Sequence, residues 1–186
     1  MLLARIVTAA LIAFTCSAGR AAAAANACEG EMRQASAKYD VPLGVLYAVG
    51  LTESGRKDSL QPLAMNIAGE PYFATSLDDA VRRFDAAEAA GIKLIDIGCM
   101  QINHYFHGDQ FPSVRRMFDP HANVDYAARF LTTLRSQEGS WTLAVARYHA
   151  GPNNNPAQKQ YVCTVITNMV ATGFGRWTDA ARDFCK

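Results

Sequence analysis

Four of the five cysteines constrain this chain more than any other feature of its sequence. They are Cys28, Cys99, Cys163 and Cys185, which remain once Cys16 of the first 25 residues is set aside. An even number of cysteines in an exported protein is typical of disulfide bonds, and four allow three pairings. Cys163 and Cys185 lie close in sequence, on either side of a turn expected near Gly173. We therefore favour a bond between these two, which leaves Cys28 to pair with Cys99. No two of the four have the close spacing of a zinc knuckle, so we expect no metal.

The first 25 residues indicate that the chain is exported. Arg5 supplies a basic start, Ile6 to Phe14 form an apolar run that is too short to span a bilayer, and Ala21 to Ala27 form a small-residue cleavage region. We expect residues 1–25 to be a cleaved signal peptide, and the mature protein to be periplasmic or secreted. An uncleaved membrane anchor and a lipidated Cys16 are the alternatives.

The mature chain, residues 26–186, has the length of a single domain. Removal of the leader changes the formal charge from +1 to −1, because two arginines and no acid are lost. A nearly neutral chain is not typical of a nucleic-acid-binding protein. We therefore expect no nucleic acid as partner, and an uncharged polymer or a small ligand instead.

Helical periodicity dominates the mature chain. Apolar residues recur at helical spacing within 28–39, 45–53, 77–84, 124–134, 141–148 and 161–169. Two short apolar runs, Ala64–Ile67 and Tyr72–Ala74, flank the sequence Ala-Gly-Glu-Pro and predict a hairpin. Ile92–Ile97 is rich in isoleucine and predicts one more short strand. The fold class is therefore α+β, predominantly α-helical, with a small β insert.

Glu53 is the residue to which we assign the chemistry. Leu46, Val49 and Gly50 precede it by seven, four and three residues, so its carboxyl lies on the apolar stripe of a helix. It also lies in the last helical turn, where the macrodipole disfavours negative charge, and Gly55 is expected to be a left-handed cap. Both effects favour the protonated acid that a general acid requires. On this helix alone, a carboxyl that frays into water is the alternative.

Three separated stretches carry a resemblance to a known family. They are Thr52–Gly55 (TESG), Gly98–Asn103 (GCMQIN) and Ala146–Gly151 (ARYHAG). Their order and spacing resemble the catalytic domain of the soluble, goose-lysozyme-like lytic transglycosylases, whose motifs are Glu-Ser, Gly-Leu-Met-Gln and Ala-Tyr-Asn-Ala-Gly. Here Cys99 replaces the leucine and His149 replaces the asparagine. The resemblance extends over about residues 28–166 and implies a lysozyme-like fold.

The same resemblance assigns roles to individual residues. Glu53 matches the single catalytic acid, and Tyr148 matches the tyrosine whose hydroxyl approaches that acid. Gln101 and Asn103 are expected to offer their side-chain amides to the sugar, and Gly98 to let the backbone approach it. The implied substrate-binding residues are Ser54, Gly98, Met100, Gln101, Asn103 and Tyr148.

In the family reaction, the acid protonates the leaving oxygen and then removes the proton of the sugar's 6-hydroxyl, so that a 1,6-anhydro ring closes. We therefore expect a monomer that cleaves the MurNAc-β-1,4-GlcNAc bond of peptidoglycan without a metal or an organic cofactor. It could serve a secretion, pilus or flagellar apparatus. One alternative is a hydrolytic lysozyme-type glycosidase, and the other is a non-catalytic wall-binding component of such an apparatus.

Three more polar residues lie near the second motif. Asp96 is the one carboxylate close enough in sequence to position a hydrolytic water, although a structural acceptor at a strand end is the simpler interpretation. His104 and His107 have a spacing that suggests a metal site, but we assign no metal to them. We expect both to be exposed loop residues.

Overall fold

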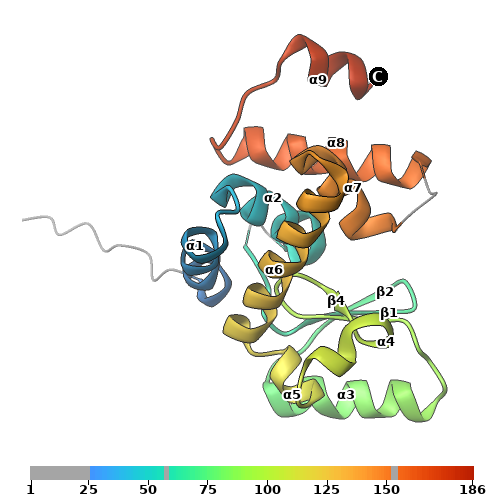
Figure 1. The fold of residues 1–186 in the computed structure, drawn as a ribbon. Coiled ribbons are helices and arrows are strands. Elements are labelled where there is room, and N and C mark those ends of the chain that lie inside the picture. Colours follow the sequence, from blue (N-terminus) through green and yellow to red (C-terminus); the bar gives the residue numbers. More distant parts are fainter. Residues whose placement is uncertain (1–25, 57–58, 152–154) are drawn as a thin grey trace, which may run out of the picture.

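The computed structural model describes residues 26–56, 59–151 and 155–186. The expected signal peptide, residues 1–25, lies outside the described residues. Most of the described chain is helical, and a small sheet lies beside α3 at one end of the molecule (Figure 1). This arrangement confirms the predicted α+β class with a predominance of helix.

Helices are present at all six predicted ranges, while α4 and α5 were not predicted. Their bounds are α1 Ala27–Tyr39, α2 Leu43–Ser54, α3 Leu77–Ala89, α4 His104–His107, α5 Val114–Met117, α6 Pro120–Glu138, α7 Trp141–Ala150, α8 Asn155–Ala171 and α9 Asp179–Phe184, with a 3-10 turn at Gly108–Gln110. Many begin with a side-chain cap, because a serine, threonine, aspartate or asparagine there accepts a bond from a backbone N–H of the first turn.

The sheet is antiparallel, with the strand order β2-β1-β3-β4. Its strands are β1 Ala64–Ile67, β2 Glu70–Phe73, β3 Ile95–Ile97 and β4 Ile102–Asn103. The β1–β2 turn uses only Ala68 and Gly69, both at positive φ, so β2 begins two residues earlier than predicted. Pro71 is tolerated there because β2 is an edge strand. The strand predicted at Ile92–Ile97 is confined to its last three residues.

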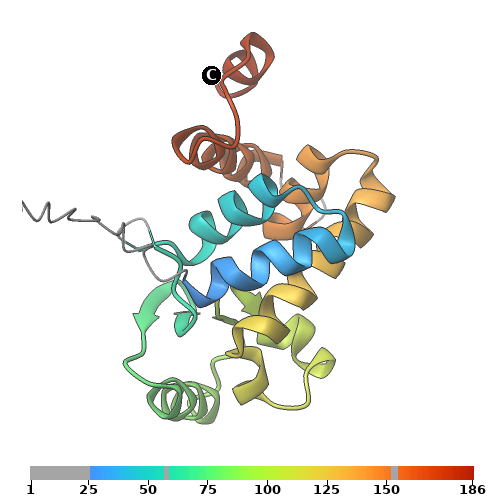
Figure 2. The ribbon, with the colours of Figure 1, turned by 90° about the vertical axis from the view of Figure 1, so that its left-hand side faces the viewer.

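The core is built around α6, which runs through the middle of the molecule with α1 and α7 packed along it (Figures 1 and 2). α2 packs against α8 and is buried nearly all round, including Leu46 and Val49. A Cβ at Gly50 would lie 2.4 Å from the Met32 methyl group, so glycine allows α1 and α2 to approach closely. The consequence for function is that the last turn of α2 ends inside the protein.

Both favoured disulfides are present. Cys28 at the start of α1 is bonded to Cys99 between β3 and β4, with the Cα atoms 5.8 Å apart. Cys163 of α8 is bonded to Cys185 just after α9, with the Cα atoms 5.6 Å apart. The first bond ties the second motif to the core, and the second attaches the C-terminal tail to α8 (Figure 1).

Gly55 corrects one prediction. It caps α2 in an extended conformation, with φ −63° and ψ 128°, and is not left-handed. Its N–H donates to Leu51 O, and a Cβ at this position would lie 2.3 Å from that same oxygen. Glycine is therefore required by the close approach of a carbonyl and not by a positive φ.

None of the helices in residues 26–56, 59–151 and 155–186 combines the length and the apolar composition that a membrane crossing requires.

The two disulfides should differ in their contribution to stability. We expect Cys28→Ala/Cys99→Ala to lower the free energy of unfolding by about 4 kcal/mol, because this bond closes the longer loop. Cys163→Ala/Cys185→Ala should lower it by about 3 kcal/mol or less, since its loop is shorter. Urea denaturation of both double variants measures the difference. A larger loss for the tail pair would contradict this ranking.

Candidate active site

Glu53 lies in the last turn of α2, where α8 covers it. Its side chain is only 14% exposed, and its Oε1 accepts a hydrogen bond of 2.5 Å from the hydroxyl of Tyr161. A second bond between the same two helices, from the Asn168 amide to the Thr52 hydroxyl, measures 2.9 Å. The carboxyl is therefore held at the interface of α2 and α8 and does not fray into water.

Burial changes the acidity of this carboxyl. Loss of hydration raises the pKa of Glu53 to about 8, against the lowering effect of the Tyr161 hydrogen bond and with a further rise from the negative charge of Asp96. At neutral pH the group is mainly the protonated acid. It can therefore donate a proton to a bound ligand, as a general acid does.

The second motif is held in shape by Asn123, a fully buried residue of α6. The Asn123 amide nitrogen donates to Ile97 O and Met117 O, and its oxygen accepts from Met100 N at 2.8 Å. Gly98 has φ 81°, and a Cβ there would lie 2.7 Å from the Asn123 amide nitrogen. This asparagine was not predicted, although a polar residue on the inward stripe next to Val124 was a signal for it.

Three of the predicted sugar contacts are internal in the structure. Ser54 is 3% exposed, and its hydroxyl donates to Cys99 O at 2.8 Å, which joins the end of α2 to the second motif. Met100 is fully buried, and Gly98 is buried against Asn123. These residues therefore lie in the protein interior, where they hold the loop between β3 and β4 against the end of α2.

The two amides are also engaged within the protein. The Gln101 nitrogen donates to Ala64 O and Gly98 O, and the Asn103 nitrogen donates to Asp96 at 2.7 Å. The Asn103 oxygen accepts from Tyr105 N. The Gln101 nitrogen uses both of its N–H groups within the protein, so its carbonyl oxygen is what can accept a bond from a ligand, whereas the Asn103 nitrogen uses one of its two N–H groups on Asp96.

Two tyrosines lie near the acid, and Tyr161 rather than Tyr148 makes the hydrogen bond to it. The Tyr148 hydroxyl donates to Met100 O at 2.8 Å, and Tyr161 makes the bond to Glu53 in its place. Tyr161 is 5% exposed and lies on the inward stripe of α8. Its hydroxyl needs a partner at such a position, and this need was the signal that the sequence offered.

His149, the second departure from the family motif, faces the acid. Its Nδ1 lies 3.9 Å from Glu53 Oε1, and its ring stacks on Tyr161 at 4.2 Å with 2° between the planes. Burial lowers the pKa of His149, while the charge of Asp96 acts in the opposite direction. The imidazole is therefore neutral at pH 7.

His104 and His107 are not the exposed loop residues that we expected. Both belong to α4 and are partly buried: His104 packs edge-on against Phe84, and Nδ1 of His107 lies 2.8 Å from the Tyr126 hydroxyl. Aromatic neighbours account for both rings. Within the described parts of the chain, no group of three or more histidine, cysteine and acidic side chains could hold a metal ion.

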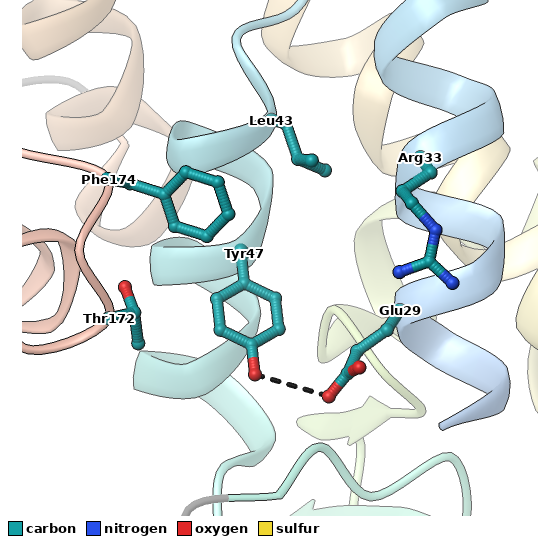
Figure 3. A pocket seen from close by; sticks show the side chains of 6 residues that line it. All are labelled: Glu29, Arg33, Leu43, Tyr47, Thr172 and Phe174. Atoms are coloured by element: carbon teal, nitrogen blue, oxygen red, sulfur yellow. Dashed lines mark hydrogen bonds between the residues drawn. The ribbon is translucent and has the colours of Figure 1, made fainter. Parts of the chain in front are cut away.

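A cavity of about 410 Å³ lies between α1, α2 and the segment after α8 (Figure 3). Its polar wall includes Glu29, which accepts a hydrogen bond of 3.2 Å from the Tyr47 hydroxyl. Neither Glu53, Tyr161 nor His149 lines it. This cavity is therefore distinct from the site around the buried acid.

The domain is predominantly helical, with a small antiparallel sheet and a buried acid at a helix end, which is the arrangement expected of a lysozyme-like protein. The family described as "Transglycosylase SLT domain" matches residues 31–168, which is most of the chain. The protein therefore belongs to this family, whose members are lytic transglycosylases that act on peptidoglycan. No match was found among curated proteins or among solved structures.

Removal of the Tyr161 hydroxyl should raise the pKa of Glu53 further. In Tyr161→Phe the carboxylate loses a hydrogen bond that stabilises it, so the carboxyl should titrate at higher pH than in the wild type. Tyr148→Phe removes the same group from a residue that donates to Met100 O, and should leave the midpoint unchanged. Carboxyl-carbon NMR, assigned with Glu53→Gln, measures both. An equal or lower midpoint in Tyr161→Phe would contradict the hydrogen bond.

Glu53 should also reduce stability as the pH rises. The unfolded chain loses this proton near pH 4.5 and the folded protein only near pH 8, so the free energy of unfolding should fall between these values. At pH 8, the free energy of unfolding of Glu53→Gln should therefore be higher than that of the wild type by roughly 3 to 5 kcal/mol. Urea denaturation at pH 5 and pH 8 tests this, with Glu88→Gln in α3 as the exposed control. If the free energy of unfolding changed with pH by the same amount in the wild type and in Glu53→Gln, the raised pKa of Glu53 would be refuted.

Proposed function

We propose that this protein is a peptidoglycan lytic transglycosylase that cleaves the MurNAc-β-1,4-GlcNAc bond and forms 1,6-anhydroMurNAc, with Glu53 as general acid and then base. The observation that carries the proposal is the buried Glu53 carboxyl, which holds its proton at neutral pH beside the second family motif. Membership of the family supplies the substrate class.

In the first step, the Glu53 carboxyl gives its proton to the glycosidic oxygen. The bond between that oxygen and the sugar C1 breaks, the shortened strand leaves, and positive charge develops at C1. The carbonyl oxygen of the sugar's own 2-acetamido group can then bond to C1, so that no second protein carboxylate is needed as nucleophile. Tyr161 hydrogen-bonds the Glu53 carboxylate that this step leaves behind.

In the second step, the Glu53 carboxylate removes the proton of the 6-hydroxyl group. The resulting oxygen attacks C1, the bond from the acetamido oxygen breaks, and the 1,6-anhydro ring closes. Glu53 is protonated again and no water is consumed. A carboxyl whose pKa lies near neutral suits both directions of proton transfer.

Hydrolysis is the second candidate, and Asp96 is the observation that favours it. Its negative charge acts on Glu53, burial raises its own pKa, and it accepts the Asn103 amide bond. A carboxylate beside the acid is a group that can orient a water molecule for attack on C1. The product of hydrolysis would be a reducing sugar end in place of the anhydro ring.

The proposed setting is the bacterial envelope outside the inner membrane, because the substrate is there and the sequence predicts export. A monomer that opens the wall locally could serve a secretion, pilus or flagellar apparatus. A wall-binding component without catalysis is the remaining alternative, and it predicts that Glu53 is dispensable.

Glu53→Gln should abolish turnover of purified wall while preserving the fold. The amide has nearly the shape of the acid but cannot donate and recover the proton, so we expect a loss of at least about 100-fold in rate. Mass spectrometry of the soluble products from the wild type should show anhydro-ended fragments, each one water lighter than the hydrolytic fragments.

Glu88→Gln in α3, an exposed glutamate, is the matched control and should digest the wall like the wild type. Products with reducing ends only would replace the transglycosylase proposal with hydrolysis through Asp96. Full activity of folded Glu53→Gln would exclude both catalytic proposals.

A further inference from the structure

The third motif departs from the family pattern at His149, and the structure gives this residue a specific place. His149 lies near the end of α7, and Tyr161 lies in α8, which packs against α7 (Figure 1). The two rings are nearly parallel, at 2°, with their centroids 4.2 Å apart. Such contact over a whole ring face fixes the position of Tyr161 and, through its hydroxyl, that of Glu53.

The three groups differ in exposure. The His149 side chain is 45% exposed, while Tyr161 beneath it is 5% exposed and the Glu53 side chain that Tyr161 hydrogen-bonds is 14% exposed. The imidazole is thus the outer layer over a hydrogen bond that is itself almost dry. The family's asparagine at this position has a smaller planar group, which covers less of a phenol ring.

We propose that His149 is a positioning residue whose ring covers the Tyr161–Glu53 hydrogen bond and keeps bulk water away from the acid. This role rests on the proposed function, since it concerns the group that we assign as the catalytic acid. It does not require His149 to touch the substrate or to transfer a proton.

The groups that face His149 explain why a neutral ring fits this place. Glu53 of α2 approaches its Nδ1 to 3.9 Å, Tyr161 of α8 lies under its ring, and Asp96 of β3 acts on it through its charge. An imidazolium here would stabilise the Glu53 carboxylate and so oppose the acid form. Because burial lowers the pKa of His149, the ring stays neutral near pH 7 and acts as cover without adding a charge.

Removal of this cover should hydrate Glu53. Loss of hydration is the largest cause of its raised pKa, so water admitted above Tyr161 should lower the midpoint of its titration. The direction is opposite to that expected for Tyr161→Phe, in which the cover stays and the hydrogen bond is lost. The two variants therefore separate the two effects on the same carboxyl.

The test compares His149→Ala with His149→Phe in the full chain without substrate. Carboxyl-carbon NMR, assigned with Glu53→Gln, follows the titration of Glu53 in each. His149→Ala removes the cover and should lower the midpoint by about one pH unit. His149→Phe keeps a ring of similar size and should stay within about 0.3 units of the wild type. His121→Ala is the control, because His121 pairs with Glu31 of α1 and not with the site.

Two results would overturn the proposal. An unchanged midpoint in His149→Ala would show that the ring does not exclude water. An equal fall in His149→Ala and His149→Phe would assign the effect to the imidazole nitrogens and not to cover. Should His149→Ala fail to fold, His149→Asn replaces it: a midpoint below that of His149→Phe supports the proposal, and an equal midpoint refutes it. Because the titration needs no turnover, a protein that is inactive on wall would refute the proposed function and leave this test intact.

Discussion

The structure depends on one unfavourable placement, a titratable carboxyl taken out of water at the end of a buried helix. Burial of a polar group costs free energy unless partners compensate, and the hydrogen bond that Glu53 accepts within the described residues comes from a neutral group, the Tyr161 hydroxyl. The protein therefore keeps the carboxyl protonated at neutral pH instead of pairing it with a cation. This arrangement lowers the stability of the fold but provides a proton that can be transferred to a ligand, a compromise that is common at functional sites.

The second motif shows how rigidly the surroundings of that carboxyl are built. Three independent restraints act on residues 98–101. Cys99 is bonded to Cys28, Met100 N donates to the side-chain oxygen of Asn123, and Met100 O accepts from the Tyr148 hydroxyl. Ser54, the neighbour of Glu53, adds a bond to Cys99 O from the other side. Residues that sequence comparison associates with sugar binding thus act largely through the backbone that they hold, and only part of the motif is open to a ligand.

The sequence predicted the longer helices, the hairpin, both disulfides and the position of Glu53 on an apolar stripe, because each follows from local periodicity or from spacing along the chain. The short helices α4 and α5 carry too few residues for a periodic pattern and were not predicted. It did not distinguish Tyr148 from Tyr161. Both lie on inward stripes, and periodicity gives the face of a helix but not the partner that a side chain reaches, which for Tyr161 is 108 positions away in the sequence. Gly55 was misread for a related reason, since a glycine after a helix has two explanations, positive φ or close approach, and only coordinates distinguish them. The strand β2 begins at Glu70, two residues before the predicted start, because the turn uses only the first two residues of the Ala-Gly-Glu-Pro sequence.

The bond between Cys28 and Cys99 has a consequence for when the protein becomes complete. A disulfide forms only where thiols can be oxidised, and the reducing cytoplasm keeps them apart. A newly made chain would therefore carry the loop beside its acid without the covalent tether to α1, and would acquire that tether only on reaching an oxidising compartment. If the chain is exported as the sequence predicts, completion of the site is tied to location, and the proposed wall-degrading activity is kept apart from the cell interior where the chain is synthesised.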